Sequence, residues 1–332
     1  MRKPKTAYIT SRFDLIYGPI EQAAIAERVE LLAPPQTPET VADLPDWLGQ
    51  VEVILSGWGA PVLDDAFLAA CPQLEAFFYG AGSVRAFVTD AFWETGIHLS
   101  SAWAANAVPV AEYAHAAILL SLKRFWPFSQ AVRQDRTYPN KEAFRVAGAY
   151  RTTVGLCSLG MIGRMMAERL ARHDLRVIAN DPYVDQVTGA NLGVEMVSLE
   201  ALFAQADVVS LHTPWLPETV GLITGELVAS MKPNATLINT SRGAVVDEEA
   251  MLDVLAARPD LWAVLDVVWP EPPSPESRLF DLPNVILTPH IAGSMGAECH
   301  RMGQYMIEEL DRYLAGEPLR WELTREKAAI MA

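Results

Sequence analysis

Short apolar runs alternate along this chain with longer segments in which apolar residues recur at helical spacing. Such runs predict buried parallel strands, and in the first third of the chain they fall at 7–10, 51–55 and 74–79. In the remainder they fall at 154–157, 175–179, 208–211, 235–239, 262–267 and 285–288. Strands of this kind joined by helices predict an α/β fold with doubly wound parallel sheets.

Three other segments carry further predictions. The spacing from Asn106 to Arg124 predicts one long amphipathic helix with Pro109 in its first turn, where a missing N–H costs nothing. Residues 125–151 are rich in aromatic and arginine side chains and predict an irregular surface segment that packs against a second subunit. Asp247 is expected to cap the helix that follows it.

A glycine-bearing turn, Ser158 to Gly163, lies between the predicted strands at 154–157 and 175–179, and the second strand leads to Asp181. A helix is expected from Met165. This βαβ pattern is typical of a dinucleotide site, in which the helix N-terminus faces the pyrophosphate and Asp181 accepts from the adenosine ribose. A carboxylate there would repel a 2′-phosphate, so the sequence predicts NAD rather than NADP. Ser158 stands where the fingerprint has glycine, and glycines that serve only close packing are the alternative.

Composition narrows the class of protein and its partners. The chain has 332 residues, of which 51% are hydrophobic and 20% charged, as expected for a soluble protein of two domains. The net charge of −15 argues against binding to nucleic acid or to an anionic membrane surface. No apolar run is long enough to span a bilayer, and no metal-ligand spacing is present. Three separated cysteines and no signal-peptide pattern predict a cytoplasmic protein.

Three polar side chains fall just beyond predicted strands of the second sheet. Arg242 lies in INTSRGAVVDEEA, Glu271 in LDVVWPEPP and His290 in VILTPHIAGS. Together with the SLGMIG turn, these strings follow the order and spacing of the D-isomer-specific 2-hydroxyacid dehydrogenase family, which the sequence resembles over nearly its whole length. The pairing of Glu271 with His290 separates it from the formate dehydrogenase branch, which pairs its histidine with a glutamine.

The resemblance implies a catalytic role for each of these residues. Reducing a 2-keto acid needs a hydride, a proton for the carbonyl oxygen and a cation for the carboxylate. His290 is expected to be the acid/base, Glu271 its orienting partner and Arg242 the anchor of the substrate carboxylate. Each residue taken alone also has a structural explanation. Together, however, the structural explanations would require three independent coincidences in one ordered pattern, so the pattern favours catalysis.

The resemblance also implies contacts with the cofactor and the substrate. Cofactor-binding residues are expected at Gly160, Met161, Ile162, Asp181, Thr213, Pro214, Thr240, Ser241, Arg242, Asp266, His290 and Gly293. Substrate-binding residues are expected at Trp58, Ala81, Gly82, Arg242 and His290. Glycine loops after strands let backbone N–H groups approach a carboxylate, although tight turns explain the same glycines equally well.

We therefore predict two Rossmann/flavodoxin-like domains with a cleft between them. The substrate-binding domain is expected at 1–104 and 296–332, and the NAD-binding domain at 105–295. The predicted function is that of an NAD-dependent oxidoreductase, a homodimer joined through the NAD domain, which interconverts a small 2-keto acid and its D-2-hydroxy acid. Glyoxylate or hydroxypyruvate is the expected type of substrate. The alternatives are a non-catalytic NAD(H)-sensing interaction protein on the same fold and a dehydrogenase of another small oxyanion such as phosphite.

Overall fold

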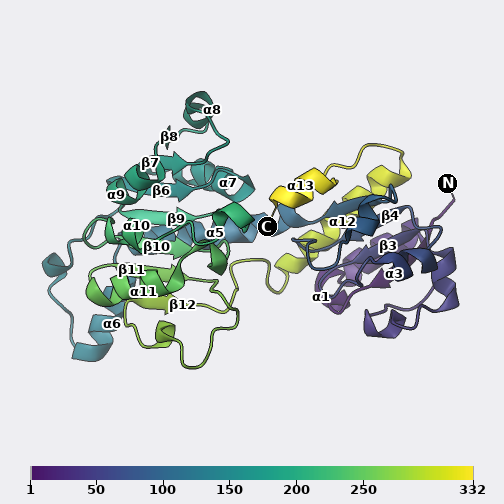
Figure 1. The fold of residues 1–332 in the computed structure, drawn as a ribbon, viewed down its shortest axis with the longest axis horizontal. Coiled ribbons are helices and arrows are strands. Elements are labelled where there is room, and N and C mark those ends of the chain that lie inside the picture. The colour runs from purple at the N-terminus through teal and green to yellow at the C-terminus, as the bar shows by residue number, and fades with distance from the viewer. Residues whose placement is uncertain (1, 332) are drawn as a thin grey trace. The chain divides into compact units, whose positions relative to one another are not determined.

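The computed structural model describes residues 2–331, which divide into two compact units (Figure 1). The first unit contains the residues up to Ala107 and those from Ser294 onward, and the second unit contains Val108–Gly293. Each unit is built around its own sheet, in which all strand pairs are parallel. The predicted α/β fold class is thereby confirmed.

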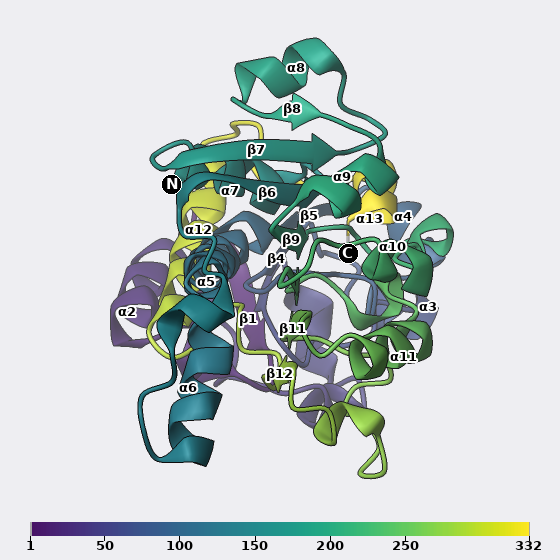
Figure 2. The ribbon, with the colours of Figure 1, turned by 90° about the vertical axis from the view of Figure 1, so that its left-hand side faces the viewer.

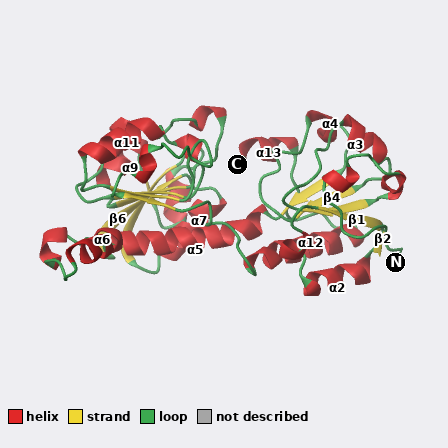
Figure 3. Ribbon diagram, turned by 90° about the horizontal axis from the view of Figure 1, so that it is seen from below, coloured by secondary structure: helices red, strands yellow, loops and turns green. Residues whose placement is uncertain are grey.

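The first unit has a five-stranded sheet in the order β2-β1-β3-β4-β5. Its strands are β1 Lys5–Ile9, β2 Glu30–Leu31, β3 Val53–Ser56, β4 Ala76–Tyr79 and β5 His98–Ser101. Its helices are α1 Phe13–Ile16, α2 Pro19–Arg28, α3 Asp65–Ala70, α4 Asp90–Trp93, α12 Glu298–Leu314 and α13 Arg325–Ile330. Helices cover both faces of this sheet, with α3 and α4 on one side and α2 and α12 on the other (Figure 3). Both faces are therefore apolar, and every residue of β3 and β4 is buried.

The second unit has a seven-stranded sheet in the order β12-β11-β10-β9-β6-β7-β8 (Figure 2). Its strands are β6 Tyr150–Cys157, β7 Asp174–Asn180, β8 Glu195–Met196, β9 Val208–Leu211, β10 Thr236–Asn239, β11 Trp262–Leu265 and β12 Val285–Leu287. Its helices are α6 Phe125–Asp135, α7 Met161–Leu170, α8 Gln186–Asn191, α9 Leu199–Gln205, α10 Gly225–Ala229 and α11 Glu248–Ala257. The strand order reverses between β6 and β9, and ligands of open α/β sheets bind at such a switch point.

Alternating side chains divide the core of the second unit between the two faces of its sheet. Val209 and Leu211 of β9 pack in a cluster with residues of α9, α10 and α11. Val208 of the same strand packs in another cluster with residues of α7 and of α5, Trp103–Leu122. Because successive strand residues point to opposite faces, even-numbered positions of β9 face α5 and α7.

Two predicted helical features differ from the structure. The long helix α5 begins at Trp103, so Pro109 lies inside it and not in its first turn. The alanine-rich segment before Pro109 is buried and extends the helix toward β5, which outweighs the backbone hydrogen bond that proline cannot make. Residues 125–135, expected to be irregular, form α6, and only the following segment contains short 3-10 and loop structure.

Candidate functional site

A row of polar residues lies at the carboxyl edge of the seven-stranded sheet. Leu211 of β9 pairs in register with Cys157 of β6 and Asn239 of β10, and the register continues through Leu265 of β11 to Leu287 of β12. The residue that follows each of these five is polar. We call this set the carboxyl-edge row: Ser158, His212, Thr240, Asp266 and Thr288.

The glycine turn joins the end of β6 to the N-terminus of α7, which begins at Met161, earlier than the sequence predicted. A Cβ atom at Gly163 would lie 2.1 Å from the Ser158 carbonyl oxygen, so only glycine fits there. At Gly160, the N-cap, an added Cβ would meet no described atom within 4 Å. The Asp181 carboxylate accepts from the Leu159 N–H at 2.7 Å, which ties the end of β7 to the turn. These features fit a pyrophosphate and a ribose on the same edge.

The conformation of Ser158 explains how it replaces the expected glycine. Its φ of 75° is in the left-handed region, which glycine adopts readily and other residues adopt at a cost of about 1–2 kcal/mol. Its hydroxyl lies 3.1 Å from the Thr213 hydroxyl, and its N–H donates to the Asn180 carbonyl at 2.8 Å. The serine side chain therefore keeps the glycine-like turn and adds a bond across the switch point between β6 and β9.

Asp266 organises the loop that carries His290. Its buried carboxylate accepts from the Thr288 hydroxyl at 2.7 Å and from the N–H groups of Ile291 and Ala292 at 2.9 and 2.8 Å. The His290 N–H donates to the carbonyl oxygens of Asp266 and Thr288. These bonds hold His290 at a φ of 54°, a left-handed conformation that needs support from its surroundings.

The structure brings His290 and Glu271 together. His290 Nδ1 lies 2.8 Å from Glu271 Oε1, and the two side chains remain 45% and 39% exposed. The carboxylate accepts from Nδ1, so Nε2 is the ring nitrogen left to exchange a proton with a bound molecule.

Arg242 lies two residues beyond the row, in the turn after β10. Its Nη1 donates to the Ser241 carbonyl at 2.7 Å, and Asn239 Nδ2 donates to the Arg242 carbonyl at 3.0 Å. A Cβ atom at Gly243 would lie 2.0 Å from the carbonyl carbon of Val268. Glycine at that position lets the Arg242 turn pack directly on the backbone that leads to Glu271.

The remaining expected cofactor residues lie around the same edge of the second unit. Met161 and Ile162 open α7, Thr213 and Pro214 follow β9, and Thr240 and Ser241 follow β10. Gly293 ends the unit, between Ala292 and Ser294. His212 was not predicted, although a polar residue directly after an apolar strand is visible in VVSLHTP. It is buried, and burial lowers its pKa to about 4.

The expected substrate residues of the first unit lie after β3 and β4. Trp58 is partly buried against both core clusters of that unit, and its carbonyl accepts from the Thr10 hydroxyl at 2.8 Å. The Ala81 N–H donates to the Tyr79 carbonyl at 2.8 Å, so the turn itself occupies this expected donor. The N–H of Gly82 is therefore the candidate donor of this loop.

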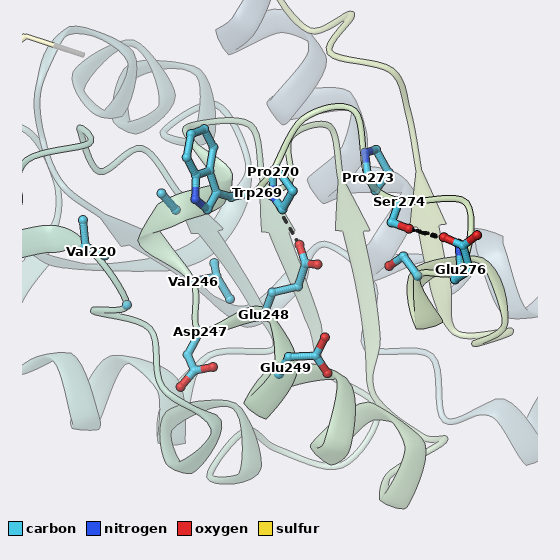
Figure 4. Close-up of a pocket in the computed structure, with 13 residues that line it drawn as sticks. Val220, Val246, Asp247, Glu248, Glu249, Trp269, Pro270, Pro273, Ser274 and Glu276 are labelled. Atoms are coloured by element: carbon cyan, nitrogen blue, oxygen red, sulfur yellow. Dashed lines mark hydrogen bonds between the residues drawn. The ribbon is translucent and has the colours of Figure 1, made fainter.

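A cavity of about 500 Å³ lies in the second unit beside the N-terminus of α11 (Figure 4). Trp269, Pro270 and Glu248 are among the residues that line it, and the Glu248 carboxylate accepts from the Trp269 N–H at 3.4 Å. Burial raises the pKa of Glu248. None of the predicted site residues lines this cavity. Within residues 2–331 no group of three or more His, Cys, Asp or Glu side chains is arranged to hold a metal, and no helix is long and apolar enough to cross a membrane.

A glycine turn at the switch point of a parallel sheet, with Asp181 after the neighbouring strand β7, is typical of dinucleotide-binding α/β proteins. Residues 115–292 match the NAD binding domain of the D-isomer specific 2-hydroxyacid dehydrogenases. The chain belongs to this family, as its sequence strings indicated, and the predicted NAD cofactor is confirmed by the same match.

The chain is similar to several curated proteins and solved structures. D-3-phosphoglycerate dehydrogenase of Mycobacterium tuberculosis is 36% identical over 258 residues, which cover 78% of this chain and 48% of that protein. The chain thus spans about half the length of the curated relatives it matches. A phosphoglycerate oxidoreductase from Rhizobium etli superposes with a TM-score of 0.82 at 23% identity, covering 98% of this chain and 99% of that one. The NAD complexed form of a D-isomer specific 2-hydroxyacid dehydrogenase from Lactobacillus delbrueckii ssp. bulgaricus has a TM-score of 0.80 at 21% identity, with 96% and 100% covered. At these identities the two structures support the fold alone.

We predict that Asp266→Asn destabilises the protein by about 1–3 kcal/mol, because the amide NH₂ must face a buried N–H of the His290 loop in either orientation. Chemical denaturation measures this change. Asp247→Asn is the matched control, since Asp247 caps α11 through the Ala250 N–H and asparagine caps helices equally well. Equal stability of Asp266→Asn and the wild type would contradict the role assigned to Asp266.

We also predict that His212 makes the ligand-free protein less stable in acid. Its folded pKa of about 4 lies below the unfolded value of about 6.5, so the unfolded state binds a proton that the folded state rejects. The free energy of unfolding of the wild type therefore decreases by about 3 kcal/mol as the pH falls from 6.5 toward 4. Denaturation of the wild type and of His212→Phe across this range measures the effect. Parallel stability curves for the two proteins would contradict it.

Proposed function

We propose that this protein is an NAD-dependent D-2-hydroxyacid dehydrogenase that interconverts a small 2-keto acid and its D-2-hydroxy acid. The observation that carries the proposal is the 2.8 Å contact between His290 Nδ1 and Glu271 Oε1 at the carboxyl edge of an NAD-binding sheet. An oriented imidazole is what proton transfer requires. The same pair is compatible with an NAD(H)-sensing protein on this fold, so turnover of a substrate is the observation that separates the two.

Each of the proposed catalytic residues has a separate role in the reaction. NADH, when bound, supplies the hydride for the keto carbon. His290 donates a proton from Nε2 to the carbonyl oxygen, and Glu271 fixes the tautomer and stabilises the imidazolium form. The guanidinium of Arg242 binds the substrate carboxylate. In the reverse direction His290 takes the proton back from the hydroxyl group.

The identity of the substrate is the finer part of the proposal. Glyoxylate or hydroxypyruvate fits the single carboxylate anchor, Arg242. D-3-phosphoglycerate is the second candidate, because the relatives cited above carry it in their names. A phosphite-type oxyanion is the third, since the same arginine can bind it.

Kinetics with a substrate panel tests the proposal. We expect NADH oxidation with at least one of glyoxylate, hydroxypyruvate, pyruvate or a bulkier 2-keto acid, or NAD reduction with D-3-phosphoglycerate or phosphite. In His290→Ala, kcat should fall about 10²–10⁴-fold while NADH binding is retained, and Glu271→Gln should lower kcat less. No turnover of the panel by a protein that binds NADH would favour the sensor, and near-normal turnover by His290→Ala would refute the assignment of the acid/base.

We further propose a homodimer joined through the second unit. Phe125 at the start of α6, Tyr138 after it and Tyr150 at the start of β6 are 44%, 86% and 61% exposed, which is typical of a surface that another subunit covers. Analytical ultracentrifugation should find a dimer that Phe125→Glu/Tyr150→Glu converts to monomer. Tyr183→Glu, at an exposed aromatic elsewhere in the unit, is the matched control and should remain dimeric. A monomeric wild type would contradict the dimer.

A further inference from the structure

His212 is a buried imidazole with no hydrogen-bond partner among the residues that the structure describes. Both ring nitrogens are unpartnered, and so is the hydroxyl of Thr240, its neighbour in the carboxyl-edge row. His212 is 9% exposed and Thr240 6%. A neutral imidazole carries one donor and one acceptor, and a buried polar group left unpaired destabilises the folded state.

At the other end of the carboxyl-edge row, the side chains of Asp266 and Thr288 have hydrogen-bond partners. Asp266 and Thr288 bond to each other, and the Tyr113 hydroxyl of α5 lies 3.0 Å from that of Thr288. Among the described residues, the row side chains that follow β11 and β12 are therefore paired with each other, whereas those that follow β9 and β10 have no partner. The unpaired part lies next to the switch point, where a ligand is expected.

The face of the sheet on which His212 lies also points to the dinucleotide. The His212 N–H donates to the Cys157 carbonyl at 2.9 Å, which continues the strand ladder by one residue. Its side chain therefore follows Val208 and Ser210 on the face covered by α5 and α7. The N-terminus of α7 is the expected pyrophosphate site. Asp181, which is expected to bind the adenosine ribose, lies at the end of β7 on the other side of β6.

We propose that His212 is a positioning residue for the nicotinamide riboside half of NAD. Its neutral imidazole, with the Thr240 hydroxyl, supplies hydrogen bonds to the uncharged carboxamide or ribose hydroxyl groups. Burial disfavours the imidazolium form, so His212 offers one donor and one acceptor without a positive charge, which suits uncharged carboxamide and hydroxyl groups. The inference rests on the NAD binding of the proposed function but not on the identity of the 2-keto acid.

Substitution of His212 tests this role, because it should stabilise the ligand-free protein and weaken the binding of NADH. In His212→Phe, the melting temperature of the ligand-free protein should rise by about 2–4 °C, because a buried unpaired group is removed. The Kd for NADH, measured by calorimetry, should increase about 10-fold or more. His212→Gln, which keeps a donor and an acceptor, should bind NADH more tightly than His212→Phe.

Ser210→Ala is the matched control. The Ser210 hydroxyl is also buried and unpartnered among the described residues, but it lies within β9, two positions before the edge. Its removal should raise the melting temperature and leave the Kd for NADH unchanged.

Three results would overturn the proposal. These are a lower melting temperature with unchanged NADH affinity in His212→Phe, equal weakening of NADH binding by Ser210→Ala, and unchanged imidazole ¹⁵N shifts of His212 when NADH is added to the wild type. The last measurement needs no variant and applies even if His212→Phe does not fold. A wild type that binds no NADH would instead refute the proposed function itself, which separates the two failures.

Discussion

The register of parallel strands at one edge of the seven-stranded sheet is the constraint on which the candidate site depends. Because Cys157, Leu211, Asn239, Leu265 and Leu287 are in register, the residues after them emerge side by side. Each of these strands is followed by a polar residue, and three of the five, His212, Thr240 and Asp266, are buried. The sheet thereby brings together residues that lie up to about 130 positions apart in the chain.

Asp266 connects this edge to His290 and Glu271, the pair that we propose to be catalytic. Its carboxylate carries no assigned chemistry in the proposed reaction, yet it binds the Thr288 hydroxyl before His290 and the backbone N–H groups of Ile291 and Ala292 after it. The close packing of Gly243 on Val268 similarly links the turn of Arg242 to the segment of Glu271. Positions of reacting groups are thus set by buried backbone contacts, which are stiffer than the half-exposed side chains they support.

The carboxyl-edge row also contains buried polar atoms for which the described residues provide no hydrogen-bond partner. Evolved cores pair nearly all of their buried polar atoms, and Asp266, Thr288 and Tyr113 follow that rule. His212 and Thr240 depart from it at the switch point, which is the place where the fold offers a ligand. The Ser158 hydroxyl, by contrast, has a partner, the Thr213 hydroxyl. This bond compensates for a backbone conformation that glycine adopts without cost.

The sequence by itself determined the local features of this protein: the apolar strands, the glycine turn, Asp247 as a helix cap, and the strings around Arg242, Glu271 and His290. These depend on neighbours within a few residues, so patterns of spacing and residue type suffice to predict them. Only the tertiary structure decided that Pro109 lies inside α5, that residues 125–135 form a helix, and that Ser158 adopts a left-handed turn. The unpaired state of His212 belongs with these, because burial and hydrogen bonding depend on strands and helices that are distant in sequence and close only after folding.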